Sequence, residues 1–310
     1  LRPDQTNAEV FMLFPTLTAA EKRKNLREQL KSGKLLQYPG SYSPLVSMMI
    51  EKKGFDGVYI SGSVLSNDLG YPDIGLTTLS EVAHRGRQIA RTTTLPSIID
   101  ADTGWGEPMN VTRTIQEFIE YGLAGCHLED QENPKRCGHL DNKSIVEPQQ
   151  MIKKITAAVQ GKKMDPNFLL IARTDARASE GLDKAIDRAK AYVDAGADMI
   201  FPEALQDEKE FEKMRKAISV PLLANMTEFG KGKLYSTTEL TNFGYNLVIY
   251  PVTTFRLALE NTEKGLDIIK STGSQNEAVG SMFTRQQLYD LTRYEEYNQF
   301  DQNIFNFKLK

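Results

Sequence analysis

Eight short apolar runs, each followed by a stretch of helical periodicity, constrain the fold of this chain more than any other feature. The runs are rich in β-branched and bulky aliphatic residues, as is typical of parallel strands buried on both faces. In chain order they are LLQY (35–38), VYIS (58–61), PSIID (96–100), GCHLE (125–129), FLLIART (168–174), MIFPE (199–203), PLLANMT (221–227) and LVIYPV (247–252).

The segments between these runs carry signals for helix ends. Ser43 followed by Pro44 predicts a helix start, and Gly54 is placed to end that helix. Eightfold alternation of strand and helix predicts a (β/α)₈ TIM barrel over residues 31–270, after an N-terminal extension over 1–30. An open doubly wound sheet is the alternative, although no glycine-rich phosphate-binding turn follows the first strand.

The C-terminal segment, residues 271–310, lies beyond the predicted barrel. An aromatic-rich stripe at helical spacing runs along it, made of Leu288, Leu291, Tyr294, Tyr297, Phe300, Ile304 and Phe307. Such a stripe needs a surface to cover it. Because eight helices already surround the barrel, we expect the segment to dock on a neighbouring subunit; folding back onto its own barrel is the alternative.

Composition excludes several classes of protein. The 310 residues have a net charge of −3, which gives no positive field for nucleic acid or anionic lipid. No apolar run approaches the roughly 20 residues of a membrane span. Two cysteines cannot build a secreted disulfide framework. We therefore expect a reducing compartment, namely a bacterial cytoplasm, or a mitochondrial matrix if a presequence has been removed.

Acidic residues end three of the predicted strands. Strand alternation places Asp100 and Asp102 on one face, and Glu129 ends the next strand. Carboxylates without histidine or thiolate ligands suit a hard cation, so we expect Mg²⁺, with Mn²⁺ as second choice. The alternative for the aspartates is a helix N-cap and a solvated loop charge.

Donor groups end the other strands. Arginine forks and amides at the mouth of a barrel indicate a ligand rich in carboxylates, since the guanidinium matches that group. Structural salt bridges are the alternative, and phosphate-binding glycine loops are absent from the corresponding turns. These candidate ligand-binding residues are Ser61, Gly62, Ser63, Arg173, Glu203, Asn225, Thr227 and Arg256.

Cys137 lies among Lys135, Arg136 and His139 in a segment full of turn formers. Neighbouring positive charge lowers a thiol pKa, so this thiol is suited to give or take a proton. The turn formers over 133–142 indicate a lid above the same mouth. The alternative is an incidental surface thiol. Cys126, in contrast, is expected to be a small buried residue.

These motifs resemble the isocitrate lyase and phosphoenolpyruvate mutase superfamily. The resemblance is carried by DADTGWG (100–106), HLEDQ (127–131) and KRCGH (135–139), with SGS (61–63), GYPD (70–73), ARTDA (172–176), FPEA (201–204), NMTEFG (225–230) and YPVTTFR (250–256) in the expected order. The chain is most similar to the short members that cleave 2-methylisocitrate, because isocitrate lyases are generally longer and phosphoenolpyruvate mutases lack the lysine–cysteine–histidine segment. One departure is Ser63, where glycine is common.

The resemblance implies Mg²⁺-dependent retro-Claisen cleavage of (2R,3S)-2-methylisocitrate into pyruvate and succinate, a step of propionate catabolism. It also implies a homotetramer with exchanged C-terminal helices. Asp100 and Asp102 match the metal aspartates, with Glu129 acting through water. The positions matched to substrate binding are Ser61, Gly62, Ser63, Asp73, Arg136, Gly138, Arg173, Glu203, Asn225, Thr227 and Arg256.

The resemblance also implies roles in proton transfer. Cys137 is expected to protonate the succinate enolate, Lys135 and His139 to tune it, and Arg173 and Glu203 to act in the same catalytic set. Tyr59 is the candidate base. Sibling activities (2,3-dimethylmalate lyase, oxaloacetate hydrolase or isocitrate lyase) and a non-catalytic carboxylate-binding barrel stay open as alternatives.

Overall fold

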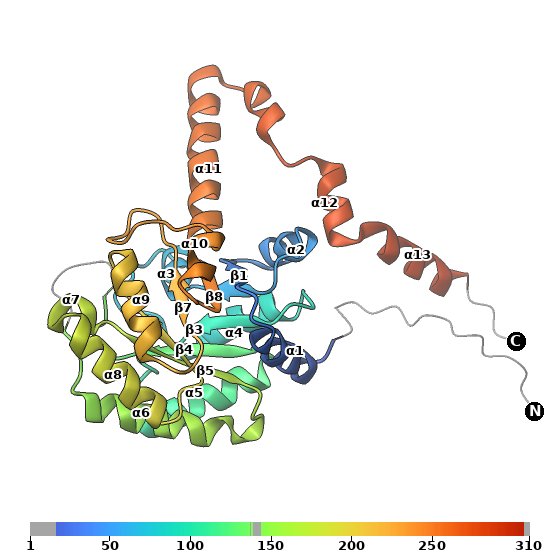
Figure 1. Ribbon diagram of the computed structural model, residues 1–310. Helices are drawn as coiled ribbons and strands as arrows, with labels where there is room; N and C mark the ends of the chain where they lie inside the picture. Colours follow the sequence, from blue (N-terminus) through green and yellow to red (C-terminus); the bar gives the residue numbers. More distant parts are fainter. Residues whose placement is uncertain (1–16, 137, 139–143, 307–310) are drawn as a thin grey trace, which may run out of the picture. The chain divides into compact units, whose positions relative to one another are not determined.

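Eight parallel strands alternate with helices in the computed structural model, which describes residues 17–136, 138 and 144–306 (Figure 1). Each predicted apolar run contains one of them, so the prediction of eight strands is confirmed. They are β1 (Leu36–Pro39), β2 (Val58–Ile60), β3 (Ser97–Asp100), β4 (Gly125–Glu129), β5 (Leu169–Thr174), β6 (Met199–Pro202), β7 (Leu223–Asn225) and β8 (Leu247–Tyr250).

Helices fill the segments between the strands and follow β8. Ser43 caps the helix that starts at Pro44, as predicted. The helices are α1 (Ala19–Lys31), α2 (Pro44–Lys52), α3 (Gly62–Asp68), α4 (Leu79–Ala90), α5 (Pro108–Glu120), α6 (Pro148–Gly161), η1 (Lys162–Met164), α7 (Ala176–Glu180), α8 (Leu182–Asp194), α9 (Glu208–Ala217), α10 (Thr237–Asn242), α11 (Thr253–Thr272), η2 (Asn276–Ser281), α12 (Arg285–Thr292) and α13 (Tyr294–Phe305).

The strands form two parallel sheets, in the orders β2-β3-β4-β5-β6 and β1-β8-β7. Neighbours in the larger sheet are consecutive in sequence, and the first strand pairs with the last, without the reversal of a doubly wound sheet. Isolated parallel bridges, Gly40↔Tyr59 and Ile200↔Leu222, lie at the two seams between the sheets. An α/β fold with parallel sheets is thus confirmed, while closure into one barrel stays a prediction.

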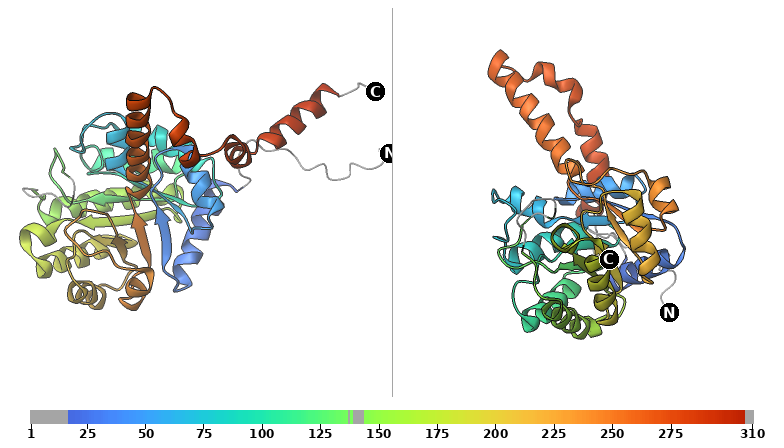
Figure 2. Two further views of the ribbon diagram at one scale, coloured as in Figure 1. Left: turned by 90° about the horizontal axis from the view of Figure 1, so that it is seen from above. Right: turned by 60° about the vertical axis from the view of Figure 1, so that its left-hand side comes forward.

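Alternation along the strands divides the core into two clusters. In β5, Leu169 and Ile171 belong to an inner cluster that also holds Tyr38 and Phe201. Leu170 and Ala172 face the other way, into the larger cluster between strands and helices. Both faces of the strands are therefore apolar, which explains why the runs are continuous rather than alternating. Figure 2 shows helices α4, α5, α6 and α8 on the outside of the strands.

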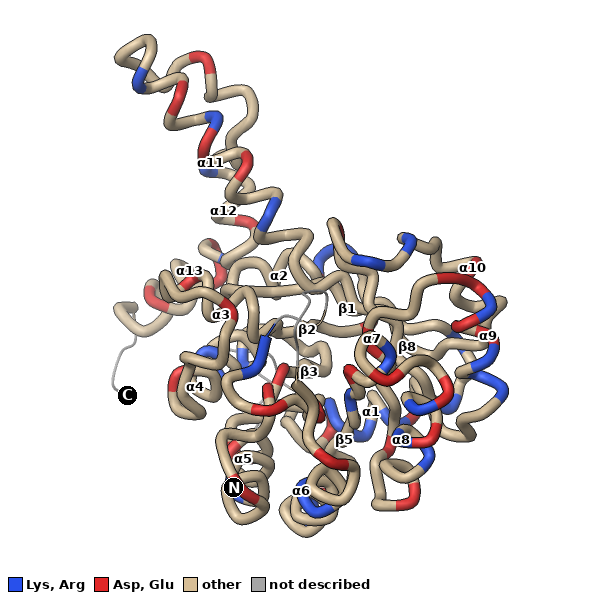
Figure 3. The backbone as a smooth tube through the Cα atoms, turned by 90° about the vertical axis from the view of Figure 1, so that its left-hand side faces the viewer, with Lys and Arg blue, Asp and Glu red and all other residues tan. Residues whose placement is uncertain are grey.

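Residues 17–260 form one compact unit, and residues 261–306 belong to a second. In the first unit, basic and acidic residues are interspersed along α8 and α9 rather than gathered by sign (Figure 3). The second unit exposes large apolar side chains, among them Tyr294, Phe300 and Ile304. No helix among residues 17–136 and 144–306 is long and apolar enough to cross a membrane.

Candidate active site

The carboxylates of Asp100 and Asp102 converge beside the backbone of Gly62. Asp100 ends β3, and Asp102 follows with φ of 44°, a left-handed conformation that few residues other than glycine adopt. The Gly62 N–H donates to Asp100 Oδ2 at 3.3 Å. A β-carbon at Gly62 would lie 2.9 Å from Asp100 Oδ2 and 3.1 Å from Asp102 Oδ1. Glycine is therefore required for the approach of the two carboxylates to this turn.

The two aspartates differ in their affinity for protons. Burial raises the pKa of Asp102 to about 6, against the opposing effect of Lys135. Burial also acts to raise the pKa of Asp100, but His127, Lys135 and Arg173 more than offset it, so that this pKa lies below its ordinary value. Asp100 is the carboxylate that stays ionised, and Asp102 is held ionised chiefly by a nearby cation.

Lys135, from the KRCGH segment, supplies a cation to this carboxylate pair. Its Nζ lies 2.8 Å from Asp102 Oδ1 and also pairs with Asp73. Burial alone would lower the pKa of this ammonium, but the surrounding carboxylates, Asp102 first, raise it well above its ordinary value. The start of the KRCGH segment is thereby fixed at the carboxylate pair.

The donor set at this point suits a divalent cation bound by few protein ligands. Asp100 and Asp102 present oxygen to one spot, which is the chemistry Mg²⁺ prefers when water and substrate complete its coordination. Among the described residues, no group of three or more His, Cys, Asp and Glu is arranged to hold a metal. The predicted third carboxylate, Glu129, instead contacts Arg173, so any part it has at a metal stays a prediction.

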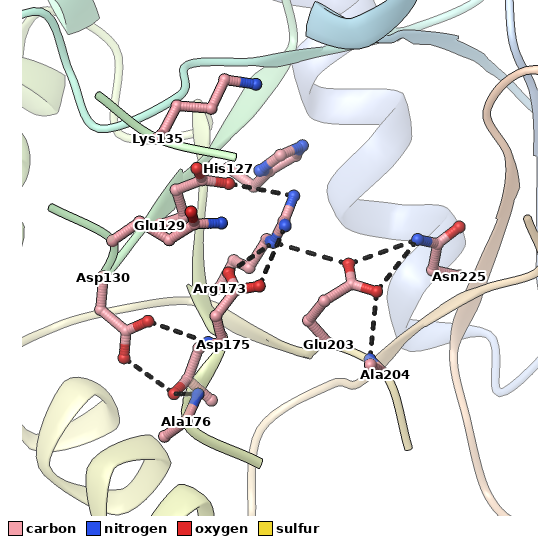
Figure 4. Close-up of polar contacts among 12 residues, drawn as sticks. His127, Glu129, Asp130, Lys135, Arg173, Asp175, Ala176, Glu203, Ala204 and Asn225 are labelled. Atoms are coloured by element: carbon pink, nitrogen blue, oxygen red, sulfur yellow. Dashed lines mark hydrogen bonds and ion pairs between the residues drawn. The ribbon is translucent and has the colours of Figure 1, made fainter. Parts of the chain in front are cut away.

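Arg173 lies at the centre of three carboxylates (Figure 4). Its Nη1 is 3.0 Å from Glu129 Oε2, and its Nε is 3.5 Å from Glu203 Oε2. Asp175 accepts from Nε at 3.0 Å and from Nη2 at 3.2 Å. The guanidinium also lies over the Phe201 ring, 5.2 Å from its centroid. Burial raises the pKa of Glu129 well above its ordinary value, and Arg173 opposes this.

Glu203 and Asn225 form the next part of the site. Asn225 Nδ2 lies 3.4 and 3.3 Å from the two oxygens of Glu203. The Ala204 N–H donates to Glu203 Oε1 at 3.0 Å, and Ala204 has φ of 58°. Asn225 and Thr227 also line a small pocket together with Pro202, Leu205, Phe211, Met226 and Leu234. Predicted ligand-binding groups thus border a small recess lined by both polar and apolar groups.

The described part of the KRCGH segment reaches the same place. Gly138 is buried, and a β-carbon there would lie 2.6 Å from Glu203 Cγ. Gln131 holds Arg136 by both backbone groups: Arg136 N donates to Gln131 Oε1 at 2.9 Å, and Gln131 Nε2 donates to Arg136 O at 2.8 Å. Cys137 and His139 lie outside the described residues.

Tyr59 is buried at the inner side of the site. Its hydroxyl lies 2.7 Å from His127 Nε2, and the two rings are stacked. Burial raises the pKa of Tyr59 well above its ordinary value and lowers that of His127 to about 4. His127 is therefore neutral near pH 7, and Tyr59 remains a phenol. Cys126 is buried, as the sequence predicted.

The remaining predicted residues lie at helix starts. Ser61 caps α3 by accepting from Val64 N, and Ser63 follows in its first turn. Arg256, on α11, donates from Nη1 to Glu228 O at 2.6 Å and to Glu228 Oε2 at 3.0 Å. Its guanidinium lies over Phe229. Arg256 is thus engaged by the loop after β7, and its contact with a substrate stays a prediction.

Sequence reasoning assigned no role to two buried carboxylates, Asp130 and Asp175. Asp175 forms the fork with Arg173, and Asp130 binds the Asp175 N–H at 2.8 Å. The available signal was an arginine and an aspartate two residues apart at a strand end, which face the same way when the strand pattern continues. Asp130 lies within HLEDQ (127–131), where no local pattern in the sequence indicates its partner.

Buried, ion-paired carboxylates and cations at the carboxyl ends of parallel strands define this protein as an α/β enzyme-type scaffold with a site for an anionic ligand. The phosphoenolpyruvate phosphomutase family model matches residues 26–270. The chain belongs to this family, and the predicted superfamily is confirmed.

Relatives cover almost the whole chain. A Corynebacterium glutamicum protein named probable 2-methylisocitrate lyase 2 is 54% identical over 95% of this chain and 96% of its own length. The 2-methylisocitrate lyase of Escherichia coli is 40% identical over 91% of this chain and 96% of its own.

Solved structures show the same fold. Oxaloacetate acetylhydrolase in complex with 3,3-difluorooxalacetate has a TM-score of 0.87 and 30% identity, covering 94% of this chain and 99% of that one. Phosphonopyruvate hydrolase in complex with oxalate and Mg²⁺ has a TM-score of 0.82 and 27% identity, covering 91% and 98%.

Proposed function

We propose that the chain acts as a 2-methylisocitrate lyase, cleaving (2R,3S)-2-methylisocitrate to pyruvate and succinate in propionate catabolism. Two relatives at 54% and 40% identity carry that name. The structural observation that carries the proposal is the Lys135–Asp102 ion pair. It joins the buried carboxylate pair to the start of the KRCGH segment, which supports our proposal that the cation and the Cys137 thiol act in one site.

Mg²⁺ is the cation we infer, with Mn²⁺ as second choice, held by Asp100 and Asp102 and through water by Glu129. The convergence of the two aspartates at Gly62 supports this, as does the Mg²⁺ named for phosphonopyruvate hydrolase. When bound, the cation lowers the pKa of the substrate hydroxyl and stabilises the carbonyl oxygen that replaces it.

Substrate carboxylates would be bound by the groups that surround this cation site. Ser61, Gly62 and Ser63 offer the start of α3, where backbone N–H groups and hydroxyls favour an anion. Arg173 and Asn225 lie next to Glu203, and Thr227 lines the same small pocket as Asn225. We propose that Asp73, Arg136, Gly138 and Arg256 complete this ligand-binding set.

Cleavage breaks the bond between the hydroxyl-bearing carbon and its neighbour. The hydroxyl proton leaves to a base, the hydroxyl carbon becomes the pyruvate carbonyl, and the bonding electron pair passes to the succinate carbon. Cys137 then gives its proton to that carbon, with Lys135 and His139 tuning the thiol. A general acid of this kind contributes about 10²- to 10⁴-fold.

The base for the hydroxyl proton is assigned to Tyr59. Because its pKa is raised by burial, Tyr59 is a phenol and accepts a proton only as it passes its own to His127. The 2.7 Å contact between Tyr59 Oη and His127 Nε2 supports such a transfer, since neutral His127 has an acceptor nitrogen to offer.

We further infer a closed (β/α)₈ barrel, supported by pairing of β1 with β8 and by the two bridges at the seams. Exposed aromatic residues of α12 and α13 support docking of residues 271–310 on a neighbouring subunit, in a homotetramer with exchanged C-terminal helices. The compartment we infer is the cytoplasm, or the mitochondrial matrix of a eukaryotic host.

Turnover on a small panel tests the proposed substrate. Methylisocitrate, isocitrate, 2,3-dimethylmalate and oxaloacetate would each be supplied with Mg²⁺ and with chelator, and pyruvate, glyoxylate and oxalate measured. We expect methylisocitrate with Mg²⁺ to give the highest kcat/KM. Faster cleavage of another panel member would transfer the assignment to that sibling activity, and no turnover of any would favour a non-catalytic carboxylate-binding protein.

A further inference from the structure

The guanidinium of Arg173 is held by a chain of buried acceptors that reaches well behind the site. Asp175 binds it through two hydrogen bonds, and the Asp175 N–H is in turn bound by Asp130 Oδ1 at 2.8 Å. Both aspartates are at most 1% exposed. A buried carboxylate carries a large desolvation cost unless its oxygens are satisfied, and these two are satisfied within a chain of hydrogen bonds that ends at the Arg173 guanidinium.

Asp130 is itself fixed on every side. Its Oδ2 accepts from Thr174 Oγ1 at 2.8 Å and from Tyr192 OH at 2.8 Å, with Arg188 Nη1 at 3.6 Å. Arg188 forms two hydrogen bonds with Glu180. Asp130 is therefore held between the carboxyl end of β5, through Thr174, and α8, through Tyr192 and Arg188.

The backbone of Asp130 also contacts the part of the chain that follows the KRCGH segment. Its carbonyl accepts from Val146 N at 2.9 Å, and Arg188 Nη1 donates to Val146 O at 2.8 Å. The next residue, Gln131, forms an antiparallel bridge with Ile145. Asp130 thus contacts both the end of β5, which carries Arg173, and residue Val146, which follows the KRCGH segment.

The hydrogen bonds fix one side of the guanidinium. Arginine has five N–H donors in a planar fork. Among the described residues, Asp175 accepts from the Nε–H and from one Nη2–H, while Glu129 Oε2 lies 3.0 Å from Nη1 as an ion-pair partner. The Nη1 end of the guanidinium lies outside the Asp175 fork, and its direction is set by that fork, as binding of an anionic ligand at this end requires.

We propose that Asp175 and Asp130 are positioning residues: Asp175 fixes the plane of the Arg173 guanidinium, and Asp130 fixes Asp175. Neither touches the reacting atoms. This inference rests on the proposed function, which supplies the substrate, a carboxylate-bearing oxyacid. It deepens that proposal by assigning the residues that orient Arg173. Loss of the fork lets the guanidinium rotate, and small misplacements of this kind cost about 10- to 100-fold in activity.

A double-mutant cycle between Asp175→Asn and Arg173→Lys tests this. Asparagine keeps the size of the side chain but offers one acceptor in place of the carboxylate fork. We expect kcat/KM for methylisocitrate to fall about 10- to 100-fold in Asp175→Asn, and the double variant to be no worse than Arg173→Lys within about twofold, because the two changes remove one function. Multiplicative losses would overturn the proposal, since Asp175 would then act independently of Arg173.

The matched control is Asp165→Asn, which breaks another arginine–aspartate pair, the partly buried Arg23–Asp165, at 2.6 Å. We expect this control to lower the melting temperature but to leave kcat/KM unchanged. An equal loss of kcat/KM in the control would assign the effect of Asp175→Asn to general destabilisation. If Asp175→Asn does not fold, Asp175→Glu, which keeps the charge and displaces it, and Asp130→Asn enter the same cycle with the same criterion.

Affinity for oxalate, measured by calorimetry with Mg²⁺ on the same variants, separates this inference from the proposed function. Absence of methylisocitrate turnover in the unmodified protein would refute the proposed function alone. Non-additive losses of oxalate affinity in the cycle would still support the positioning role, and additive losses would overturn it.

Discussion

The two ends of the strands use the same kinds of side chain in opposite ways. At the amino ends, Lys22 of α1 donates to the carbonyl of Ala90, and Arg23 donates to Leu123 O at 2.8 Å while pairing with Asp165. These cations are buried and their partners are mostly neutral carbonyls. Leu26, which is 0% exposed, packs on the inner core between them. This end is closed by contacts that need nothing from outside the chain.

The carboxyl ends are not balanced in this way. Five buried carboxylates lie there beside two buried cations, Lys135 and Arg173; the carboxylates are Asp100, Asp102, Glu129, Asp175 and Glu203. Burial raises the pKa values of Asp102 and Glu129, against the opposing effects of Lys135 and Arg173. A bound cation would offset the excess of negative charge at the carboxyl ends. The amino ends have no such excess, because their buried cations are paired within the chain. The comparison teaches that charge imbalance, rather than charge itself, distinguishes the site.

The largest predicted effect is loss of the proposed cation. Asp102→Ala removes one of two converging carboxylates. We expect the activation barrier to rise by several kcal/mol, so that kcat falls by a factor of about 10³ to 10⁴. Chelation should reproduce the loss in the unmodified protein. Calorimetry with Mn²⁺ provides the check: an unchanged affinity in Asp102→Ala would contradict the assignment of this residue to the cation.

Cys137→Ser tests the proposed proton donor. A serine hydroxyl is a much weaker acid than a thiol, so we expect turnover to fall about 10²- to 10³-fold while Mg²⁺ affinity stays nearly the same. Steady-state kinetics and metal titration measure the two quantities. Near-normal rates would exclude the thiol as the donor.

At the opposite end of the strands, Leu26→Ala should affect stability alone. Removal of a fully buried leucine side chain costs about 2 to 5 kcal/mol of unfolding free energy. Below the lowered unfolding temperature, kcat and KM should be unchanged. Thermal unfolding and kinetics on Leu26→Ala, with exposed Lys24→Ala as the matched control on α1, measure this; a kinetic defect in Leu26→Ala would show that the two ends are not independent.

The smallest effect concerns the second thiol. Burial raises the pKa of Cys126 well above its ordinary value, so this thiol stays protonated and unreactive even at pH 8 to 9. In the native protein, a thiol reagent should therefore modify Cys137 and leave Cys126 unmodified until denaturant is added. Mass spectrometry of the labelled peptides gives the answer, and native labelling of Cys126 would contradict its burial.

The strands and the acidic pair were predictable because their causes are local. Continuous apolar runs report burial on both faces, and strand alternation placed Asp100 and Asp102 together. The left-handed φ of Asp102 and the approach of its carboxylate to Gly62 at the start of α3 were not predictable, because they join parts of the chain far apart in sequence.

Partners of arginine side chains depend on distant segments in the same way. Arg173 was expected to hold a ligand, yet Asp175 and Glu129 already bind part of its guanidinium. Arg256 was expected at the mouth, and Glu228 engages it. A long side chain such as arginine can contact any acceptor that folding brings within its reach. Its partners therefore depend on the tertiary structure and cannot be read from its position in the sequence.

Pairing of β1 with β8 has a consequence for biosynthesis. Leu36 is paired with Leu247. During synthesis, the backbone groups along this edge of β1 therefore stay unpaired until β8 has been translated, which is after most of the chain has left the ribosome. Contacts of such long sequence separation close slowly, and until then the exposed edge is open to pairing with other nascent chains. Production of the protein should accordingly depend on chaperone capacity more strongly than its final stability would suggest.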